Sequence, residues 1–172
     1  MNNSDQKETI TLIGAGLVGS LLAVLLAKRG YRVEIYERRD DIRKNQISAG
    51  RSINLALANR GIYPLQQAGL MEQVTPILTT MKGRMVHDIE GKQNFQSYGQ
   101  KPEEVIYSVS RGELNKICMN AAEATGLVNI HFNQKCESAN FETQHITLTD
   151  ETSGQSQLTS FERLIGTDGS SS

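Results

Sequence analysis

The sequence predicts an α/β fold that opens with a strand–helix–strand unit and continues into mixed sheets. The first observation is a glycine-rich turn, Gly14-Ala15-Gly16-Leu17-Val18-Gly19, between a short apolar run and a long apolar stretch. The second is an acidic residue, Glu37, directly after the next strand-like run, Arg32–Tyr36. This order of strand, glycine turn, helix, strand and acid is typical of dinucleotide binding. The third observation is a later series of hairpin and meander patterns, which adds antiparallel strands to the parallel start.

Each part of the glycine turn has a physical role in this interpretation. Gly14 permits the tight turn, Gly16 lets the backbone approach a pyrophosphate, and Gly19 lets helix and strand pack closely. The helix that follows offers free N–H groups and a positive dipole end to phosphates. Glu37 can accept hydrogen bonds from a ribose diol.

The first half of the chain follows this pattern in order. Apolar spacing predicts a strand over 9–14, a helix over 17–29 that Gly30 caps, and a strand over 32–36. A polar loop is expected over 38–50. Two helical segments then follow, over 54–59 and 62–74, with punctuation at Gly61 and Gly69.

The second half changes toward strands. A turn at 90–92 predicts a hairpin of strands 84–89 and 94–98, and a further short strand covers 105–109. Ser110 and Glu113 form a capping-box pattern for a helix over 111–124, which Gly126 ends. The remaining elements expected are a strand over 128–132, an antiparallel meander over 134–141, 145–149 and 157–159, and a last strand over 163–167.

Composition excludes several classes of protein. The formal net charge is −1, without a basic stripe, so nucleic acid is not an expected partner. No apolar run reaches the roughly 18 residues of a membrane span. Cys118 and Cys136 make no disulfide framework, which favours a reducing, cytoplasmic location. The three histidines lack metal-ligand spacing, so no metal is expected.

The identity of the nucleotide depends on two places in the chain. Glu37 favours an unphosphorylated ribose, as in NAD or the adenosine half of FAD. Arg38 and Arg39 directly after it suit either a 2′-phosphate or a solvated loop face. Thr167-Asp168-Gly169 offers a second acidic contact, which an elongated cofactor such as FAD needs, although an Asp-Gly pair is also a common turn. The chain stops soon after this turn, which suggests a truncated fold.

Two motifs resemble those of the FAD-dependent aromatic hydroxylases, the class A flavoprotein monooxygenases. The run from Gly14 to Ser20 resembles their first FAD motif, and Gly166–Gly169 resembles their Asp-Gly motif. Longer strings are similar to the kynurenine hydroxylases within that family. These strings are Gly50–Leu57 with Arg60-Gly61, Ser108–Arg111 with Leu114-Asn115-Lys116, and His131-Phe132-Asn133.

The resemblance implies a Rossmann-like FAD-binding domain of the glutathione-reductase type with an inserted sheet of a substrate domain. It divides the chain into a FAD-binding part (1–80), the start of the substrate-domain sheet (81–108) and a return to the FAD-binding domain (109–172). The implied reaction converts L-kynurenine to 3-hydroxy-L-kynurenine with NADPH and O₂, a step of tryptophan catabolism and NAD biosynthesis. The later parts of the family are absent, so the 172 residues alone are expected to turn over weakly or not at all.

The resemblance also implies roles for individual residues, and the flavin rather than a side chain would carry the chemistry. Implied FAD contacts are Gly14, Gly16, Val18, Gly19, Tyr36, Glu37, Arg38, Arg39, Ala56, Arg111, Cys136 and Asp168. Arg84 and Tyr98 are implied to bind the carboxylate of the substrate, as a bidentate arginine can. On sequence alone these two are more often a surface arginine and a half-buried tyrosine. An arginine at a helix start, such as Arg111, is unfavourable unless an anion lies nearby.

Three alternatives stay open. The parent protein could be another FAD-dependent aromatic hydroxylase or a flavin reductase. The chain could be a cofactor-binding module without turnover. An NAD-dependent dehydrogenase is disfavoured by the late Asp-Gly turn and by the hairpin insertion.

Overall fold

The computed structural model describes residues 8–44, 54–101 and 103–169, and within these ranges the chain divides into two compact units. The first unit combines residues of the ranges 1–48 and 115–172. The second unit contains the residues between them, 49–114. Each unit has its own sheets and is described by itself.

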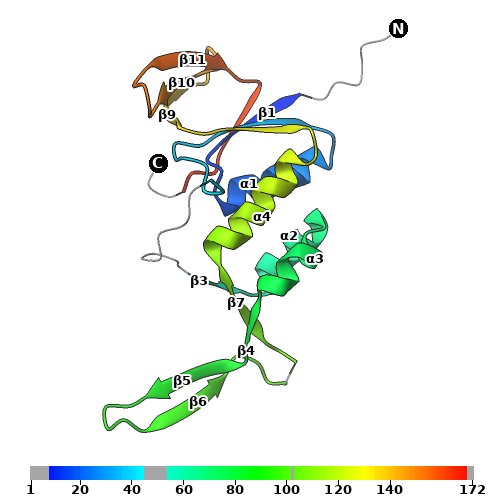
Figure 1. Cartoon of the computed structure of the whole chain (residues 1–172), viewed down its shortest axis with the longest axis vertical. Coiled ribbons are helices and arrows are strands. Elements are labelled where there is room, and N and C mark those ends of the chain that lie inside the picture. The colour runs from blue at the N-terminus through cyan, green and yellow to red at the C-terminus, as the bar shows by residue number, and fades with distance from the viewer. Residues whose placement is uncertain (1–7, 45–53, 102, 170–172) are drawn as a thin grey trace. The chain divides into compact units, whose positions relative to one another are not determined.

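The first unit contains a four-stranded parallel sheet with the order β12-β1-β2-β8 (Figure 1). Its strands are β1 (Thr9–Ile13), β2 (Arg32–Tyr36), β8 (Val128–His131) and β12 (Arg163–Gly166). Ile13 pairs with Tyr36 on one side and with Gly166 on the other, so three strands end level with one another. The predicted parallel strand–helix–strand start is confirmed, and the loops that follow these strands share one edge of the sheet.

Helix α1 (Leu17–Ala27) joins β1 to β2 and buries a face made mainly of small residues. These are Gly19, Ser20, Ala23, Val24 and Ala27. Small side chains let the helix axis approach the sheet closely. Gly30 follows with a φ of 82°; its N–H donates to the Ala27 carbonyl, and the N–H of Tyr31 donates to that of Leu26. This double closure is the Schellman arrangement, so the predicted glycine cap is confirmed.

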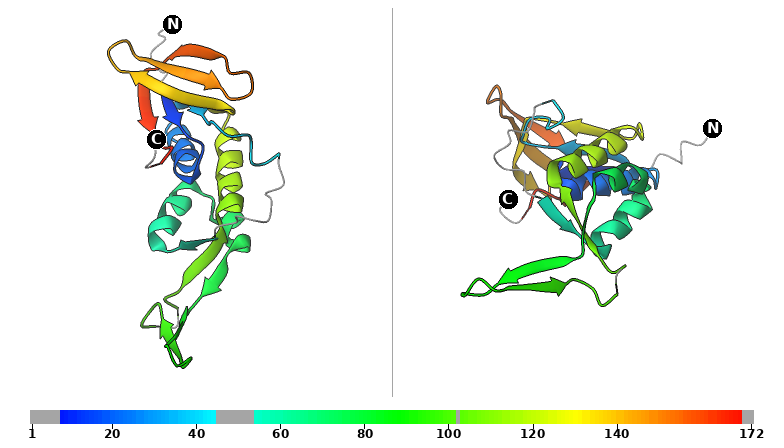
Figure 2. Two further views of the ribbon diagram at one scale, coloured as in Figure 1. Left: turned by 90° about the vertical axis from the view of Figure 1, so that its left-hand side faces the viewer. Right: turned by 60° about the horizontal axis from the view of Figure 1, so that its bottom comes forward.

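The predicted meander is also confirmed, as a three-stranded antiparallel sheet of the first unit (Figure 2). Its strands are β9 (Gln134–Asn140), β10 (His145–Asp150) and β11 (Ser156–Ser160), in the order β11-β10-β9. The alternating residues Ile146 and Leu148 of β10 are fully buried and pack with Ile13 and Phe161. This cluster anchors the meander to the end of β1.

The second unit corrects one expectation, because residues 54–57 form a strand and not a helix. β3 (Asn54–Leu57) pairs antiparallel with β7 (Ile106–Ser110), and β7 pairs on its other side with β4 (Thr79–Met81). Burial alternates along β3, with Leu55 and Leu57 turned inward, which is the period of a strand. Four residues are too few for the sequence pattern to distinguish this period from a helical one.

The helices that follow β3 have other bounds than the predicted 54–59 and 62–74. α2 (Asn59–Ala68) runs through Gly61 without interruption, and Gly69, with a φ of 76°, ends it as predicted. A short α3 (Met71–Val74) and a 3₁₀ turn, η1 (Thr75–Ile77), complete the segment. Gly61 is therefore not punctuation. A Cβ there would lie 2.5 Å from Leu57 Cδ1, the end of a flexible side chain that can shift.

The predicted hairpin is confirmed as β5 (Gly83–His87) and β6 (Gln93–Ser97), and most of its residues are exposed. The predicted strand at 105–109 corresponds to β7. The capped helix is α4 (Arg111–Glu123), where the N–H of Glu113 donates to Ser110 Oγ at 3.4 Å. Gly126, with a φ of 70°, closes it by donating to the Glu123 carbonyl. Among the described residues, no helix combines the length and apolarity that a bilayer span requires.

Candidate cofactor site

The glycine turn between β1 and α1 is the centre of the candidate site. Gly14 has a φ of 99°, and its N–H donates to the Tyr36 carbonyl at 2.8 Å, so the turn is fixed to the end of β2. A Cβ on Gly19 would lie 2.0 Å from the Gly14 carbonyl oxygen, which no packing adjustment of a backbone atom accommodates. Gly14 therefore serves the shape of the turn, and Gly19 allows the helix to pack directly against that turn.

Gly16 is different, because a Cβ at this position would meet nothing within 4 Å. Its φ of −69° is open to any residue. Gly16 is the N-cap of α1 and supplies no side-chain cap, and the first turn of the helix contains no acid. The exposed start of α1 thus presents backbone N–H groups and a positive dipole end, the arrangement that binds phosphate. Val18, in this first turn, is 68% exposed.

Glu37 is buried directly after β2 and is hydrogen-bonded to the glycine turn. Its carboxylate accepts the Ala15 N–H at 2.8 Å through Oε2 and the Arg39 N–H at 3.0 Å through Oε1. Arg39 Nε also lies 3.5 Å from Oε1, and both Arg38 and Arg39 are exposed. Each carboxylate oxygen has a second lone-pair direction, so the group can accept further hydrogen bonds from a diol.

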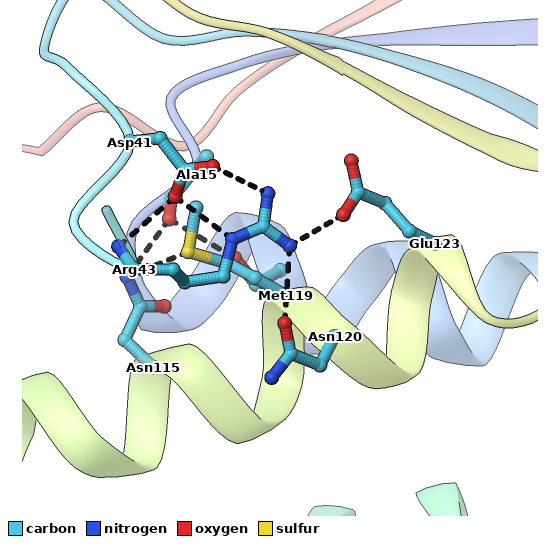
Figure 3. Close-up of polar contacts among 8 residues, drawn as sticks. Ala15, Asp41, Arg43, Asn115, Met119, Asn120 and Glu123 are labelled. Carbon is cyan, nitrogen blue, oxygen red and sulfur yellow. Dashed lines mark hydrogen bonds and ion pairs between the residues drawn. The ribbon is translucent and has the colours of Figure 1, made fainter.

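A pocket in the first unit extends from the glycine turn past Glu37. Residues from the glycine turn, the loop after β2, helix α4 and the end of β8 line this pocket. They are Ala15, Gly16, Glu37, Arg39, Asp40, Ile42, Asn115, Met119 and Phe132. Asn115 donates through Nδ2 to the Ala15 carbonyl at 3.0 Å (Figure 3). Its Oδ1 is buried and accepts no hydrogen bond within the described residues. A buried acceptor of this kind requires a donor, and the amino group or ribose hydroxyls of an adenosine supply one. The residues present therefore fit the adenosine half of a dinucleotide.

The late Asp-Gly turn meets the glycine turn, as the pairing of β12 with β1 requires. The Thr167 hydroxyl lies 2.8 Å from the carbonyl oxygens of both Ile13 and Gly14. A Cβ on Gly14 would lie 2.8 Å from Asp168 Cα, so the two turns are in direct backbone contact. Asp168 itself is exposed at this edge of the sheet.

Two further predicted residues lie beside this edge and are half-buried. Cys136, on β9, packs against the Ile146–Leu148 cluster; burial and then the charge of Asp168 raise the pKa of its thiol. Tyr36 stacks on His131 with ring centroids 4.9 Å apart. Burial, followed by the charge of Glu34, raises the pKa of the Tyr36 hydroxyl. Cys136 and Tyr36 do not line the pocket.

The other predicted residues belong to the second unit. Ala56 is exposed on β3, and Arg111 is the exposed first residue of α4. Arg84, on β5, donates through Nε to Gln96 Oε1 at 2.9 Å. Tyr98 follows β6, and its N–H donates to the Lys82 carbonyl at 3.0 Å. Residues 50–53 of the similar strings lie outside the described residues.

The hairpin register brings Arg84 and Tyr98 to one face. Arg84 pairs with Gln96, and Tyr98 stands two residues beyond Gln96, which makes Arg84 and Tyr98 diagonal neighbours. Tyr98 also lines a pocket of the second unit together with Arg60 and residues 103–106.

Sequence reasoning assigned no cofactor role to several residues of the first-unit site, among them Asp40, Ile42, Asn115, Met119, Phe132 and Thr167. Asn115 and Met119 stand four residues apart on α4 and so share one helix face. That spacing was readable from the sequence. The pairing of this face with the glycine turn was not, because it joins segments 100 residues apart.

Comparison with known proteins decides the family. A family model described as FAD binding domain matches residues 7–172. The chain belongs to this family. The FAD binding domain assignment agrees with the predicted motifs at Gly14–Gly19 and Gly166–Gly169 and with the predicted α/β class.

Two curated relatives of this FAD binding domain carry the same name. The kynurenine 3-monooxygenase of Myxococcus xanthus is 43% identical over 167 residues, which are 97% of this chain and 36% of that protein. A kynurenine 3-monooxygenase of Xanthomonas campestris is 40% identical over 172 residues, 100% of this chain and 38% of that protein. The predicted resemblance is confirmed, and the chain spans little more than a third of the length of these relatives.

Solved structures share the fold at low sequence identity. The flavin-dependent monooxygenase PieE, determined with FAD and substrate, superposes with a TM-score of 0.80 at 17% identity, covering 97% of this chain and 31% of that one. The p-nitrophenol 4-monooxygenase of Pseudomonas putida gives 0.73 at 18% identity, covering 96% and 42%.

Proposed function

We propose that the chain is the FAD-binding part of a monooxygenase that hydroxylates L-kynurenine to 3-hydroxy-L-kynurenine with NADPH and O₂. The names of the relatives support the substrate and the reaction. The observation that carries the cofactor assignment is the meeting of three loops at one sheet edge. The glycine turn, the buried Glu37 and Asp168 follow three strands that end level with one another. An elongated cofactor such as FAD needs a second acidic contact, and Asp168 beside the glycine turn offers one. The proposed fold is Rossmann-like and of the glutathione-reductase type.

Different residues of the first unit bind different parts of FAD. The open backbone at Gly16, with Val18 in the first helical turn and Gly14 and Gly19 shaping the loop, accommodates the diphosphate. Glu37 accepts the ribose hydroxyls of the adenosine half, and Arg38 and Arg39 stand at its solvent side. Asp168 faces the ribityl chain. Cys136 gives a backbone contact at the adenine end, and Tyr36, at the end of β2, is a further cofactor contact. When bound, FAD supplies the redox chemistry that couples NADPH and O₂ to hydroxylation.

Residues of the second unit complete the proposed assignment. Arg111 at the start of α4 pairs with a cofactor oxygen, which offsets its unfavourable position at a helix N-terminus. The strand of Ala56 passes the flavin. Arg84 binds the substrate carboxylate in bidentate fashion and Tyr98 donates a hydrogen bond to it, because the hairpin places both on one face.

The domain division and the location are parts of the same proposal. Residues 1–80 and 109–172 form the FAD-binding domain, and residues 81–108 begin the substrate-domain sheet. The exposed apolar side chains of the hairpin, including Met85 and Phe95, suit a sheet that packs against further chain. Two free cysteines suit a reducing compartment, so we propose a cytoplasmic location.

The cofactor assignment is tested by equilibrium titration of the purified chain with FAD, with NAD titrated in parallel. Saturable binding of FAD, with NAD bound at least about a hundredfold more weakly, is the expected result. Tight binding of NAD without binding of FAD contradicts the assignment and favours a dehydrogenase.

The substrate assignment is tested by backbone amide chemical shifts of the FAD-loaded chain. Added L-kynurenine is expected to shift the amides around Arg84 and Tyr98, and kynuramine, which lacks the carboxylate, is not. Arg84→Met removes the response to L-kynurenine. Equal responses to both compounds contradict recognition of the carboxylate by this hairpin.

A further inference from the structure

An ion-pair cluster around the buried Asp41 lies beside the adenosine pocket and contains none of the residues predicted to bind the cofactor. Arg43, in the loop after β2, donates through Nε to Asp41 Oδ1 and through Nη2 to Asp41 Oδ2, both at 2.8 Å. The Asp41 side chain is 7% exposed and that of Arg43 20%. This is the two-pronged arginine–carboxylate geometry, in which the planar fork fixes the direction of both partners.

The same guanidinium reaches helix α4. Nη1 donates to Asn120 Oδ1 at 3.1 Å and also pairs with the carboxylate of Glu123 (Figure 3). Its Cζ lies 5.5 Å from the centre of the Phe132 ring, within the range of a cation–π contact. One side chain thus connects the loop after β2, the C-terminal end of α4 and the residue that follows β8.

These three segments are the walls of the adenosine pocket. Ile42, between Asp41 and Arg43, lines the pocket from the loop, and Phe132 lines it from the end of β8. On α4, Asn115, Met119 and Glu123 are spaced by four residues, so the two lining residues and the partner of Arg43 share one helix face. Arg43 itself does not line the pocket.

Other contacts hold the neighbouring part of the loop to the β8–β9 turn. Asn133 donates through Nδ2 to Asp40 Oδ1 at 2.9 Å, and its N–H donates to the Arg39 carbonyl at 3.3 Å. These bonds fix Arg39 and Asp40 near Glu37. The part of the loop that contains Ile42 is joined to α4 through the contacts of Arg43 with Asn120 and Glu123.

We propose that Arg43 is a positioning residue for the adenosine half of the cofactor: by fixing Asp41 to α4 and Phe132, it sets the width of the pocket. The inference rests on the proposed FAD-binding function. Loss of the guanidinium releases Ile42 from the α4 wall and leaves the buried Asp41 carboxylate without its partner, so the pocket loses its preformed width. The effect belongs to the adenosine half, since none of these residues lies at the Asp168 end of the site.

The test measures dissociation constants of FAD and of ADP for the 172-residue chain and its variants by calorimetric titration, with circular dichroism at the same temperature. Arg43→Gln is expected to raise the dissociation constants of FAD and of ADP by the same factor, at least about tenfold. Arg43→Lys keeps the positive charge but lacks the two-pronged guanidinium, so the loss of affinity for FAD and for ADP is expected to be smaller. Arg163→Gln is the matched control, because Arg163 forms a two-pronged pair with Glu8 that is exposed and remote from the pocket. It leaves both constants unchanged.

Three results overturn the inference. These are wild-type affinity for FAD in Arg43→Gln, a loss for FAD without an equal loss for ADP, and a loss of the same size in Arg163→Gln. If Arg43→Gln is unfolded, Arg43→Lys decides the matter, and wild-type affinity for ADP in that folded variant overturns the inference. Failure of the wild-type chain to bind FAD at all contradicts the proposed function instead.

Discussion

Two glycines of one motif have different reasons to be glycine. Gly19 is required by the protein, because a Cβ there would lie 2.0 Å from the Gly14 carbonyl oxygen. Gly16 has open space around it and an ordinary φ, so nothing within the described residues requires it. We propose that a ligand that approaches the backbone requires it. The sequence motif identifies both positions, and only the structure separates the two causes.

This difference predicts opposite results for two alanine variants. Gly19→Ala is expected to lower the free energy of unfolding by about 3 kcal/mol or more, through overpacking against backbone. Gly16→Ala is expected to cost less than about 1 kcal/mol of stability, the scale of a helix N-cap change, yet to weaken FAD binding by at least about tenfold. Urea denaturation and FAD titration of both variants measure the two quantities. A stable Gly19→Ala variant, or full FAD affinity in Gly16→Ala, contradicts this account.

Glu37 has a structural role in the glycine turn, and we propose that it also binds the cofactor. Its carboxylate accepts the backbone N–H groups of Ala15 and Arg39, and a glutamine at the position has only one acceptor oxygen. Glu37→Gln is therefore expected to lower the free energy of unfolding by about 1.5–3 kcal/mol. It is also expected to lower the affinity for FAD. The control is Glu34→Gln on the same strand, whose carboxylate contacts the side chains of Asn129 and His131. We expect this control to retain FAD affinity, and equal losses in both variants would count against a specific role for Glu37.

At the scale of elements, the pattern of the sequence predicted most strands and helices and failed where the pattern was short. The long apolar stretch of α1, the capping box of α4 and the turn of the β5–β6 hairpin are local features, so the chain itself specifies them. Residues 54–57 become a strand because β7, about 50 residues later, supplies a partner. A pattern within four residues cannot indicate a strand partner that lies so far along the chain.

The loop after β2 predicts a pH dependence of stability. The Arg43 guanidinium, through its hydrogen bonds, holds the pKa of Asp41 below its ordinary value. A carboxyl with a depressed pKa in the folded state stabilises the fold above its unfolded pKa of about 4, and the contribution disappears as the pH falls through the folded pKa. The free energy of unfolding is therefore expected to fall more steeply from about pH 5 to pH 3 in the wild type than in Asp41→Asn. Urea denaturation across this range measures the slopes, and equal slopes contradict the assigned ion pair.

The hairpin predicts uneven protection of backbone amides. β5 and β6 pair only with each other within the described residues, and nearly all of their side chains are exposed. A two-stranded ribbon without a covered face is marginally stable in water. We expect the amides of β5 and β6 to exchange with deuterium much faster than those of the buried strand β1, as read by mass spectrometry of peptides. Protection of the hairpin equal to that of β1 would show that this chain already covers it.

At the scale of the molecule, the site combines loops that follow β1, β2 and β12 with one face of α4. The sequence predicted the first three because motifs mark them, at Gly14–Gly19, Glu37 and Asp168. The α4 face, with Asn115 and Met119, and the Arg43 cluster carry no motif, and they were found only after the chain was folded. The chain spans 36–38% of the length of the kynurenine 3-monooxygenases of Myxococcus xanthus and Xanthomonas campestris.

The most direct test of the central claim is a crystal structure of this chain grown with FAD. The account predicts the diphosphate at the start of α1 beside Gly16, the adenosine ribose within hydrogen-bonding distance of the Glu37 carboxylate, and the adenine against Phe132 and Met119. An adenosine half bound away from Glu37, or a diphosphate bound anywhere other than the glycine turn, would contradict it.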